Sequence, residues 1–252
     1  MTPSEAPSTD FDARAAAYDR LRPAGDAWWA RFDAVVRLGE LRGQRVLDVG
    51  CGTGAVAAAL AERASAKVWG VEASAEMLAV ARGRVPRGVG LKQGRAEDLP
   101  FRDAWFDRVV YSLVIHLVDR PAALAEAARV LVDGGRVVVA TFAHEHFDRY
   151  WAGRFFPSLA AVDKARFPTE QALGAELVAA GFAGIQSEPL YACEQVDRET
   201  ALERLRGRHI STFDLLDPDE VERGIERAER ELPEIVDIQL EQLIVTAHRI
   251  AR

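Results

Sequence analysis

Cysteine is scarce in this sequence of 252 residues, which contains only Cys51 and Cys193. Two cysteines are too few for a disulfide framework, and their separation does not match the short spacings of zinc ligands. No cluster of histidine, cysteine and acidic residues has ligand spacing either. We therefore expect no redox cysteine and no metal site.

The sequence also lacks a long apolar run and an excess of basic residues. No stretch approaches the ~20 apolar residues that span a bilayer, and the N-terminus lacks the basic-then-apolar pattern of a signal peptide. The formal net charge is -7, so no general attraction to nucleic-acid phosphates or anionic lipids is expected. These absences predict a cytoplasmic protein with no membrane span and no nucleic-acid partner, and they leave the oligomeric state open.

What is present is the composition of an ordinary globular protein. Apolar residues make up 49% of the chain and charged residues 28%, and the length suits one α/β domain better than two. Residues 1–9 (MTPSEAPST) are predicted to form a disordered tail, and residues 10–252 a single domain. Within that domain, residues 10–41 carry apolar side chains at helical spacing, which predicts two helices broken near Pro23-Ala24-Gly25.

Strand-like and helix-like segments alternate over residues 42–142. Short segments rich in Val and Leu predict strands buried on both faces of a parallel sheet, at Arg45 to Val49, Lys67 to Glu72, Gly90 to Gln93, Phe106 to Ser112 and Gly135 to Phe142. Helices are predicted between strands at Ala55 to Ala64, Ser74 to Val85 and Pro121 to Leu131.

The pattern changes after residue 142. Residues 143–167 indicate an irregular or helical excursion, and Pro168 to Ala180 a helix that ends at Gly181. Two more strands are predicted, at Gly184 to about Val196 and Val236 to Ala247, with a helical cap over residues 198–233 between them. In that cap Asp217 and Pro218 begin a helix, with Glu220 expected to reach back and complete a capping box. The prediction is an α/β fold: a doubly wound, mostly parallel, seven-stranded sheet with an N-terminal helical lid and a helical insertion before the last strand.

The segment Val46-Leu47-Asp48-Val49-Gly50-Cys51-Gly52-Thr53-Gly54 carries the sharpest functional signal. A strand runs into a glycine-rich turn that opens a helix. Gly50, Gly52 and Gly54 allow a tight turn and the close approach of a ligand, towards which the N–H groups of the helix N-terminus point. By itself, this pattern also fits a dinucleotide-binding turn.

Two acidic residues favour a ligand other than a dinucleotide. Asp48 places a carboxylate beside the glycine turn, where it would repel a pyrophosphate and attract a cationic amino group. Glu72 ends the second strand, where a carboxylate can accept both hydroxyls of a ribose. A zwitterionic methionyl group with an attached nucleoside fits this pair better than NAD.

With these residues the sequence resembles the class I S-adenosylmethionine-dependent methyltransferases, in particular the small-molecule group related to ubiquinone/menaquinone C-methylases. The resemblance covers residues 46–142, through VLDVGCGTG, VWGVEASAEML, GRAEDLPF, FDRVVYSLVIHLVD and LVDGGRVVVATF, and is looser in FDARAAAYDRLRP and in the C-terminal third. It implies a Rossmann-like methyltransferase fold with its cofactor-binding core at residues 42–142, S-adenosyl-L-methionine as cofactor, and methyl transfer to a small organic acceptor through O, N or C.

The resemblance also implies roles for individual residues. Asp48 and the turn Gly50, Cys51, Gly52 and Gly54 would surround the methionyl group, Glu72 with Ala73 the ribose, and Met77 one face of the adenine. Ala96 would offer a backbone N–H to the adenine edge, Glu97 would accept from its amine, and Ser112 would lie beside the cofactor. Arg95 departs from the family, which often has an acidic residue there, so Ala96, Glu97 and Asp98 all stay open as the adenine partner.

The acceptor end is defined less sharply. His116 follows the fourth strand where a general base could act, although it could equally be a structural histidine bonded to backbone. Tyr18, His144 and Arg208 are candidates for contact with the acceptor, and each has an alternative reading as a packing or surface residue. The rival functions are an NAD-dependent oxidoreductase and a non-catalytic S-adenosylmethionine-binding protein.

Overall fold

A computed structural model describes residues 10–251, so the predicted tail of residues 1–9 lies outside the described residues. The strands of the sheet are β1 Arg45–Val49, β2 Lys67–Glu72, β3 Gly90–Gln93, β4 Phe106–Ser112, β5 Leu131–Phe142, β6 Phe182–Asp197 and β7 Ile235–Arg249. They form one sheet in the order β3-β2-β1-β4-β5-β7-β6. β7 runs antiparallel to both of its neighbours, and the pairs from β3 to β5 are parallel, which confirms the predicted sheet.

The helices are α1 Phe11–Arg14, α2 Tyr18–Leu21, α3 Asp26–Gly39, α4 Ala55–Arg63, α5 Ala75–Arg84, α6 Arg120–Val130, α7 His144–Arg149, α8 Leu159–Arg166, α9 Glu170–Ala179, α10 Arg198–Arg206 and α11 Pro218–Glu231. Short 3₁₀ turns lie at Ile115–Leu117, Trp151–Arg154 and Ser211–Asp214. None of the described helices is long and apolar enough to cross a membrane.

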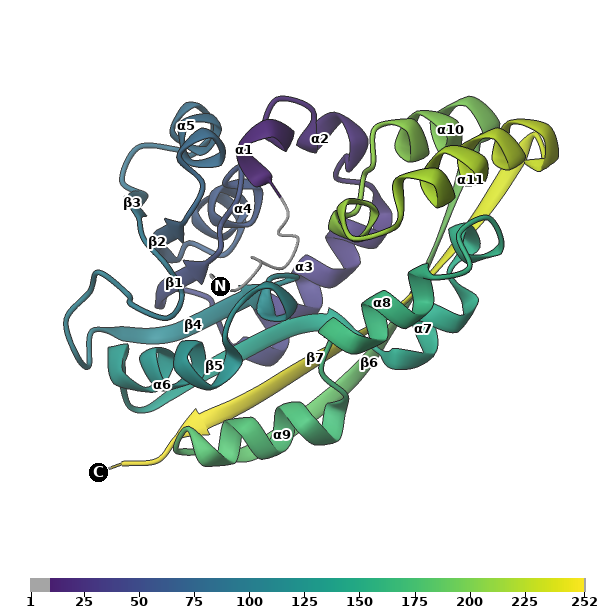
Figure 1. Ribbon diagram of the computed structural model, residues 1–252. Coiled ribbons are helices and arrows are strands. Elements are labelled where there is room, and N and C mark those ends of the chain that lie inside the picture. Colours follow the sequence, from purple (N-terminus) through teal and green to yellow (C-terminus); the bar gives the residue numbers. More distant parts are fainter. Residues whose placement is uncertain (1–9, 252) are drawn as a thin grey trace, which may run out of the picture.

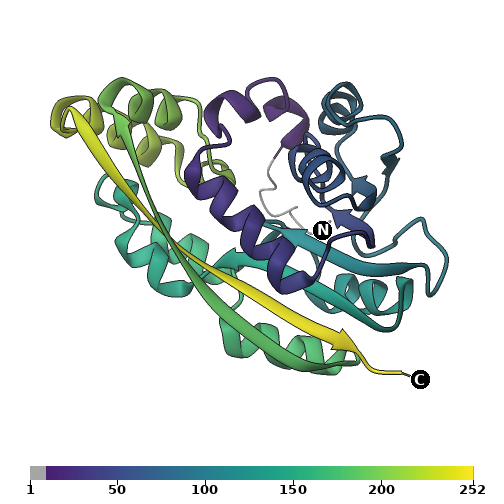
Figure 2. The ribbon, with the colours of Figure 1, turned by 180° about the vertical axis from the view of Figure 1, so that it is seen from behind.

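Alternating side chains of the strands divide the core between the two faces of the sheet. On one face Val46 and Val110 pack with α3 and α4, and on the other Leu47 and Val109 pack with α6 and α9. Figures 1 and 2 show these two layers from opposite sides. Strands covered on both faces must be apolar on both faces, which is why the core strands read as continuous runs of Val and Leu.

The strands β6 and β7 extend far beyond the parallel part of the sheet and carry the cap. Figure 1 shows this long ribbon running from the lower edge of the sheet to α10 and α11 at the opposite end. A separate apolar cluster, which includes Phe155, Phe156, Phe213 and Leu205, joins these helices to the distal part of the ribbon. The cap is therefore held over the carboxyl ends of the core strands.

Two local predictions were wrong in detail. The segment before Pro23 forms two short helices, α1 and α2, where one was predicted. Glu220 does not complete a capping box: Asp217 alone accepts the N–H groups at the start of α11, and Glu220 Oε1 accepts the N–H of Ser158 at 2.9 Å. Its carboxylate thus joins α11 of the cap to the start of α8, which is a tertiary contact that the local pattern cannot show.

Candidate active site

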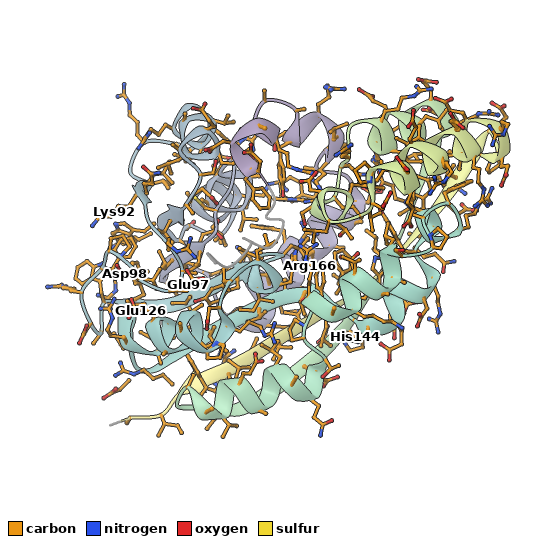
Figure 3. The ribbon with its side chains drawn as sticks, in the orientation of Figure 1. Lys92, Glu97, Asp98, Glu126, His144 and Arg166 are labelled. Atoms are coloured by element: carbon orange, nitrogen blue, oxygen red, sulfur yellow. The ribbon has the colours of Figure 1, made fainter. Side chains whose placement is uncertain are left out.

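A cavity of about 590 Å³ lies between the glycine turn after β1, the N-terminal helices and the cap. This volume is typical of sites for small molecules. It opens at the carboxyl ends of β1, β4 and β5, where doubly wound sheets bind their ligands. Figure 3 shows Arg166 near the centre of the molecule, with Glu97 and Asp98 towards the β3 side.

The glycine turn has a left-handed backbone at all three glycines, with φ of 67° at Gly50, 54° at Gly52 and 79° at Gly54. The N–H groups of Gly50 and Cys51 donate to the carbonyl of Val71 in β2, which fixes the turn against the sheet. A Cβ on Gly50 would lie 2.4 Å from Cγ2 of Val114, whereas one on Gly52 would meet nothing within 4 Å. Gly50 is therefore required for packing, and Gly52 leaves room for a ligand.

Asp48 is the most unusual ionisable group in the cavity. It is 1% exposed, and its Oδ2 has no hydrogen-bond partner among the described residues. Burial, with a further contribution from the charge of Glu72, raises the pKa of Asp48 to about 8, and the N–H of Ala57 opposes this. Such a carboxyl is in place for a cationic group that would pair with it.

Glu72 receives two backbone N–H groups at the end of β2. Its Oε2 accepts from the N–H of Gly52 at 2.9 Å, and its Oε1 accepts from the N–H of Ser74 at 3.0 Å. Each carboxylate oxygen has a further lone pair for a ligand hydroxyl. Met77 follows in the first turn of α5, is 1% exposed and donates its N–H to Ser74 Oγ.

The predicted adenine contacts are less open than the glycine turn. Ala96 is buried, while Glu97 accepts the N–H of Asp119 at 3.0 Å and pairs with Nε of Arg95 at 3.3 Å. The unusual Arg95 thus neutralises the acid that was expected to receive the adenine amine. Ser112, at the end of β4, lines the cavity, and so does Cys51 in the glycine turn. Burial strongly raises the pKa of the Cys51 thiol.

The N-terminal helices form a strap across the cavity. Asp12 accepts a hydrogen bond from Ser74 Oγ, and Asp19 accepts from Thr53 Oγ1 at 2.8 Å, so both hold the strap to the glycine-turn side. On the other side Arg14 donates through Nε to Asp214 in the cap at 3.0 Å. The strap is the predicted helical lid, and it closes the space between cofactor side and cap.

His116 lies inside the cavity at the end of the β4 loop. Its ring stacks on Phe167 with centroids 3.8 Å apart, and its Nδ1 is buried without a partner among residues 10–251. Burial first, and then the charges of Arg166 and Arg22, hold the pKa of His116 well below its ordinary value. His116 thus lines the cavity as a neutral imidazole whose Nδ1 is unpartnered among the described residues. Tyr18 also lines it, and its hydroxyl accepts from Arg22 at 2.8 Å.

His144 and Arg208, predicted to contact an acceptor, are not among the residues that line the cavity. Six residues of the predicted cofactor site do not line it either: Gly54, Glu72, Ala73, Met77, Ala96 and Glu97. His144 begins α7 and its ring nitrogen bonds to the carbonyl of Phe167 at 2.9 Å, while Arg208 is exposed and 3.9 Å from Asp214. Because α7 is a helix, the side chain two residues on points to the opposite side, and His146 enters the cavity instead. In the cap, Arg204 does so in place of Arg208.

Sequence reasoning missed other polar groups that line the cavity, among them Arg22, Arg31, Tyr150, His209 and Gln242. A signal existed for Arg31. It lies four residues after Ala27 and four before Val35, which are both buried, so it falls on the inward face of α3. A charged residue on that face indicates a polar interior. No set of three or more candidate metal ligands was found among the described residues.

Comparison with known proteins agrees with this geometry. A family model described as a methyltransferase domain matches residues 47–139. The chain is 41% identical over 118 residues to O-methyltransferase cnsE of Penicillium expansum (44% of this chain, 42% of that one). It is 41% identical over 140 residues to demethylmenaquinone methyltransferase of Tropheryma whipplei (53% and 58%). It thus spans about half the length of these curated relatives.

Among solved structures, a proposed methyltransferase from an antibiotic biosynthesis pathway of Anabaena variabilis is similar over 86% of this chain and 96% of its own, with a TM-score of 0.67 and 26% identity. Residues 47–139 therefore carry a methyltransferase domain, and it lies within an α/β fold. The matched domain and these similarities support the resemblance to class I S-adenosylmethionine-dependent methyltransferases that the sequence motifs indicate.

Proposed function

We propose that the protein transfers a methyl group from S-adenosylmethionine to a small organic acceptor. The observation that carries this proposal is the buried, unpartnered carboxyl of Asp48 beside a glycine turn with room for a ligand. A cationic amino group would satisfy the free oxygen, whereas the phosphates of a dinucleotide would face a carboxyl there.

The described residues fit S-adenosylmethionine at both ends of the turn. Asp48 would hold the ammonium, the open backbone at Gly52 the methionyl chain, and Glu72 the ribose hydroxyls, with Ala73, Met77, Ala96 and Ser112 around the remainder. When bound, the cofactor supplies an electrophilic methyl group on a sulfonium. The protein's own contribution is then to hold the acceptor in line with that methyl and to exclude water, which the strap and cap are placed to do.

His116 is our candidate for a group that acts on the acceptor. Its Nδ1 is free and its imidazole is neutral over the physiological range, so it can accept a hydrogen bond from a hydroxyl or amine. Arg166 and Arg22 disfavour the imidazolium form, which makes positioning of the acceptor a larger part of the role than full removal of its proton.

The rival functions differ in simple measurements. An NAD-dependent oxidoreductase would bind NADH and alter the fluorescence of Trp28 and Trp29, which line the cavity. A non-catalytic protein would bind S-adenosylmethionine but form no S-adenosylhomocysteine with any acceptor. We expect micromolar binding of S-adenosylmethionine and S-adenosylhomocysteine by calorimetry, and no measurable binding of NAD. The reverse preference would overturn the proposal.

We further propose that residues 10–252 act as a single domain in the cytoplasm and that the partner is a small molecule and not nucleic acid. The negative net charge of -7 supports the exclusion of nucleic acid. The enclosed cavity supports a small acceptor.

Substitution of Glu72 by alanine should weaken binding of S-adenosylhomocysteine by roughly ten-fold to a few hundred-fold, because hydrogen bonds to a charged group contribute about 1.5–3 kcal/mol each. The side chain also holds Gly52 and Ser74, so the loss should be partly shared by ligands without ribose hydroxyls. Glu72→Gln should recover only part of the affinity, since one acceptor oxygen is replaced by a donor. Titration calorimetry of the folded variants checks this, and unchanged affinity in Glu72→Ala would show that the ribose assignment is wrong.

A further inference from the structure

Two guanidinium groups in the cavity have no acidic partner among the described residues. Arg22, after α2, bonds only to the hydroxyl of Tyr18, and Arg31, on α3, has no hydrogen bond or ion pair among residues 10–251. Burial, and then the charge of Arg22, lowers the pKa of Arg31 to about 10. Two like charges withdrawn from water are unfavourable unless anions pair with them.

The acids around the cavity do not supply those anions. Asp19 pairs with Arg84 at 2.5 Å, Glu194 with Arg204 at 2.7 Å and Asp163 with Arg166 at 3.7 Å. Glu62 is exposed at the rim. Asp48 is not among the groups whose charges act on Arg31, which are Arg22 and Tyr18. Two positive charges in the cavity therefore remain to be matched by ligands.

The cofactor in the proposed function brings only one carboxylate. Arg31 would pair with that carboxylate, because it also lines a small pocket with Val56 of α4 and with Ser112 at the end of β4, the part of the cavity proposed for the cofactor. Arg22 lies towards the cap, since its charge acts on His116, Tyr150 and His209. One guanidinium thus remains for the acceptor, on the side of the cavity where the acceptor would bind.

Flat rings form the wall of this part of the cavity. The ring of Phe142 stacks on His146 with centroids 4.4 Å apart, and Phe167 stacks on His116 and lies 6.0 Å from Phe142. All four residues line the cavity. Such rings favour a planar ligand, through offset or edge contacts.

Resting on the proposed function, we infer that the acceptor is a small aromatic acid whose carboxylate pairs with Arg22 and whose ring lies against Phe142 and Phe167. The guanidinium fork matches a carboxylate in two parallel hydrogen bonds, and one of its nitrogens is already held by Tyr18, which fixes its direction. The acceptor would then enter as an anion and place its nucleophilic atom towards the glycine turn.

The test uses benzoate and its neutral isostere benzamide, titrated by calorimetry into protein saturated with S-adenosylhomocysteine at constant ionic strength. In the wild type, benzoate should bind about ten-fold more tightly than benzamide, because a charge-assisted hydrogen bond is lost in the amide. In Arg22→Met this preference should disappear, and in Arg22→Lys it should be partly kept, because the charge remains without the fork.

Arg20→Met is the matched control, since Arg20 lies in α2 only two residues before Arg22, but its side chain is 61% exposed and pairs with Glu203 of the cap. It should keep the preference for benzoate. Arg31→Met should weaken the binding of S-adenosylhomocysteine and leave the preference for benzoate over benzamide intact. The inference is overturned if Arg22→Met weakens the binding of S-adenosylhomocysteine and not that of benzoate, or if the wild type does not bind benzoate more tightly than benzamide. Failure of the wild type to bind S-adenosylhomocysteine would overturn the proposed function itself, and the inference with it.

Discussion

Replacing Asp48 with asparagine is expected to weaken binding of S-adenosylhomocysteine by roughly a hundred-fold, and to raise the thermal stability of the ligand-free protein at pH 8. The first effect follows because removing one partner of a buried ion pair costs about 3–5 kcal/mol, part of which the amide oxygen recovers. The second follows because the carboxyl is 1% exposed and has no partner for Oδ2 among the described residues. The same residue would therefore support binding at the expense of stability.

The pH dependence gives this prediction its sharpest form. The pKa of Asp48 is raised to about 8 in the folded protein, above its ordinary value near 4 in the unfolded chain. Between these values the folded state holds a proton that the unfolded state has lost. The stability contributed by this protonated carboxyl is full below about pH 4 and is lost as the pH rises towards 8. Asparagine does not titrate, so its advantage in melting temperature should grow from about pH 5 to pH 8 and then stay constant.

Asp107 provides the matched control at the opposite end of the neighbouring strand. Hydrogen bonds from Arg45 hold the pKa of Asp107 below its ordinary value. Asp107→Asn should therefore reduce stability at neutral pH, with a smaller loss in acid, and leave S-adenosylhomocysteine binding unchanged. Thermal unfolding from pH 5 to 9 and calorimetry check both variants. A folded Asp48→Asn protein with wild-type affinity for S-adenosylhomocysteine would contradict the role proposed for Asp48.

The second large effect is expected at two neighbouring glycines, which alanine should impair in different ways. Gly50→Ala combines a left-handed φ of 67° with a Cβ only 2.4 Å from Val114 Cγ2, so it should reduce the free energy of unfolding by about 2–5 kcal/mol. Gly52→Ala carries the same kind of backbone strain, with φ of 54°, but its Cβ meets nothing within 4 Å. Its loss of stability should stay near 1–2 kcal/mol.

Gly52→Ala, the variant expected to lose less stability, should be the one whose ligand-binding site is directly obstructed. The Cβ of Gly52→Ala projects into the space that the methionyl chain would fill, so this folded variant should lose at least about ten-fold in S-adenosylhomocysteine affinity. In Gly50→Ala the clash should be partly relieved by Val114→Ala, because one contact of 3.1 Å to the Cβ of residue 114 remains. Urea unfolding of the single and double variants measures this coupling. A Gly52→Ala protein that binds normally would show that the turn does not face the cofactor.

Much of the fold follows from local patterns in the sequence. Arg45–Val49 and Phe106–Ser112 are short, and the adjacent apolar residues at their centres face both sides of a sheet. This pattern predicts buried parallel strands, and the observed bounds agree. The order of the two acids, Asp48 before the glycine turn and Glu72 at the next strand end, was equally readable, because parallel strands end at one edge. The capping box predicted at Glu220 was wrong because a distant partner, the N–H of Ser158, takes up its carboxylate.

The sequence by itself therefore determined the sheet, the glycine turn and the places of Asp48 and Glu72 at strand ends, because these depend on periodicity and on residues close together in the chain. Only the tertiary structure decided the acceptor side. Arg22, Phe167 and His209 come from three separate segments, and which of their side chains point inward depends on how the cap and the strap pack over the sheet. His144 and Arg208 have the right chemistry in the right segments, yet the position of His144 on α7 and the left-handed backbone of Arg208 direct them away from the cavity. Helix rotation and long-range packing leave no local pattern in a single sequence, and for that reason the acceptor had to be inferred from the folded protein.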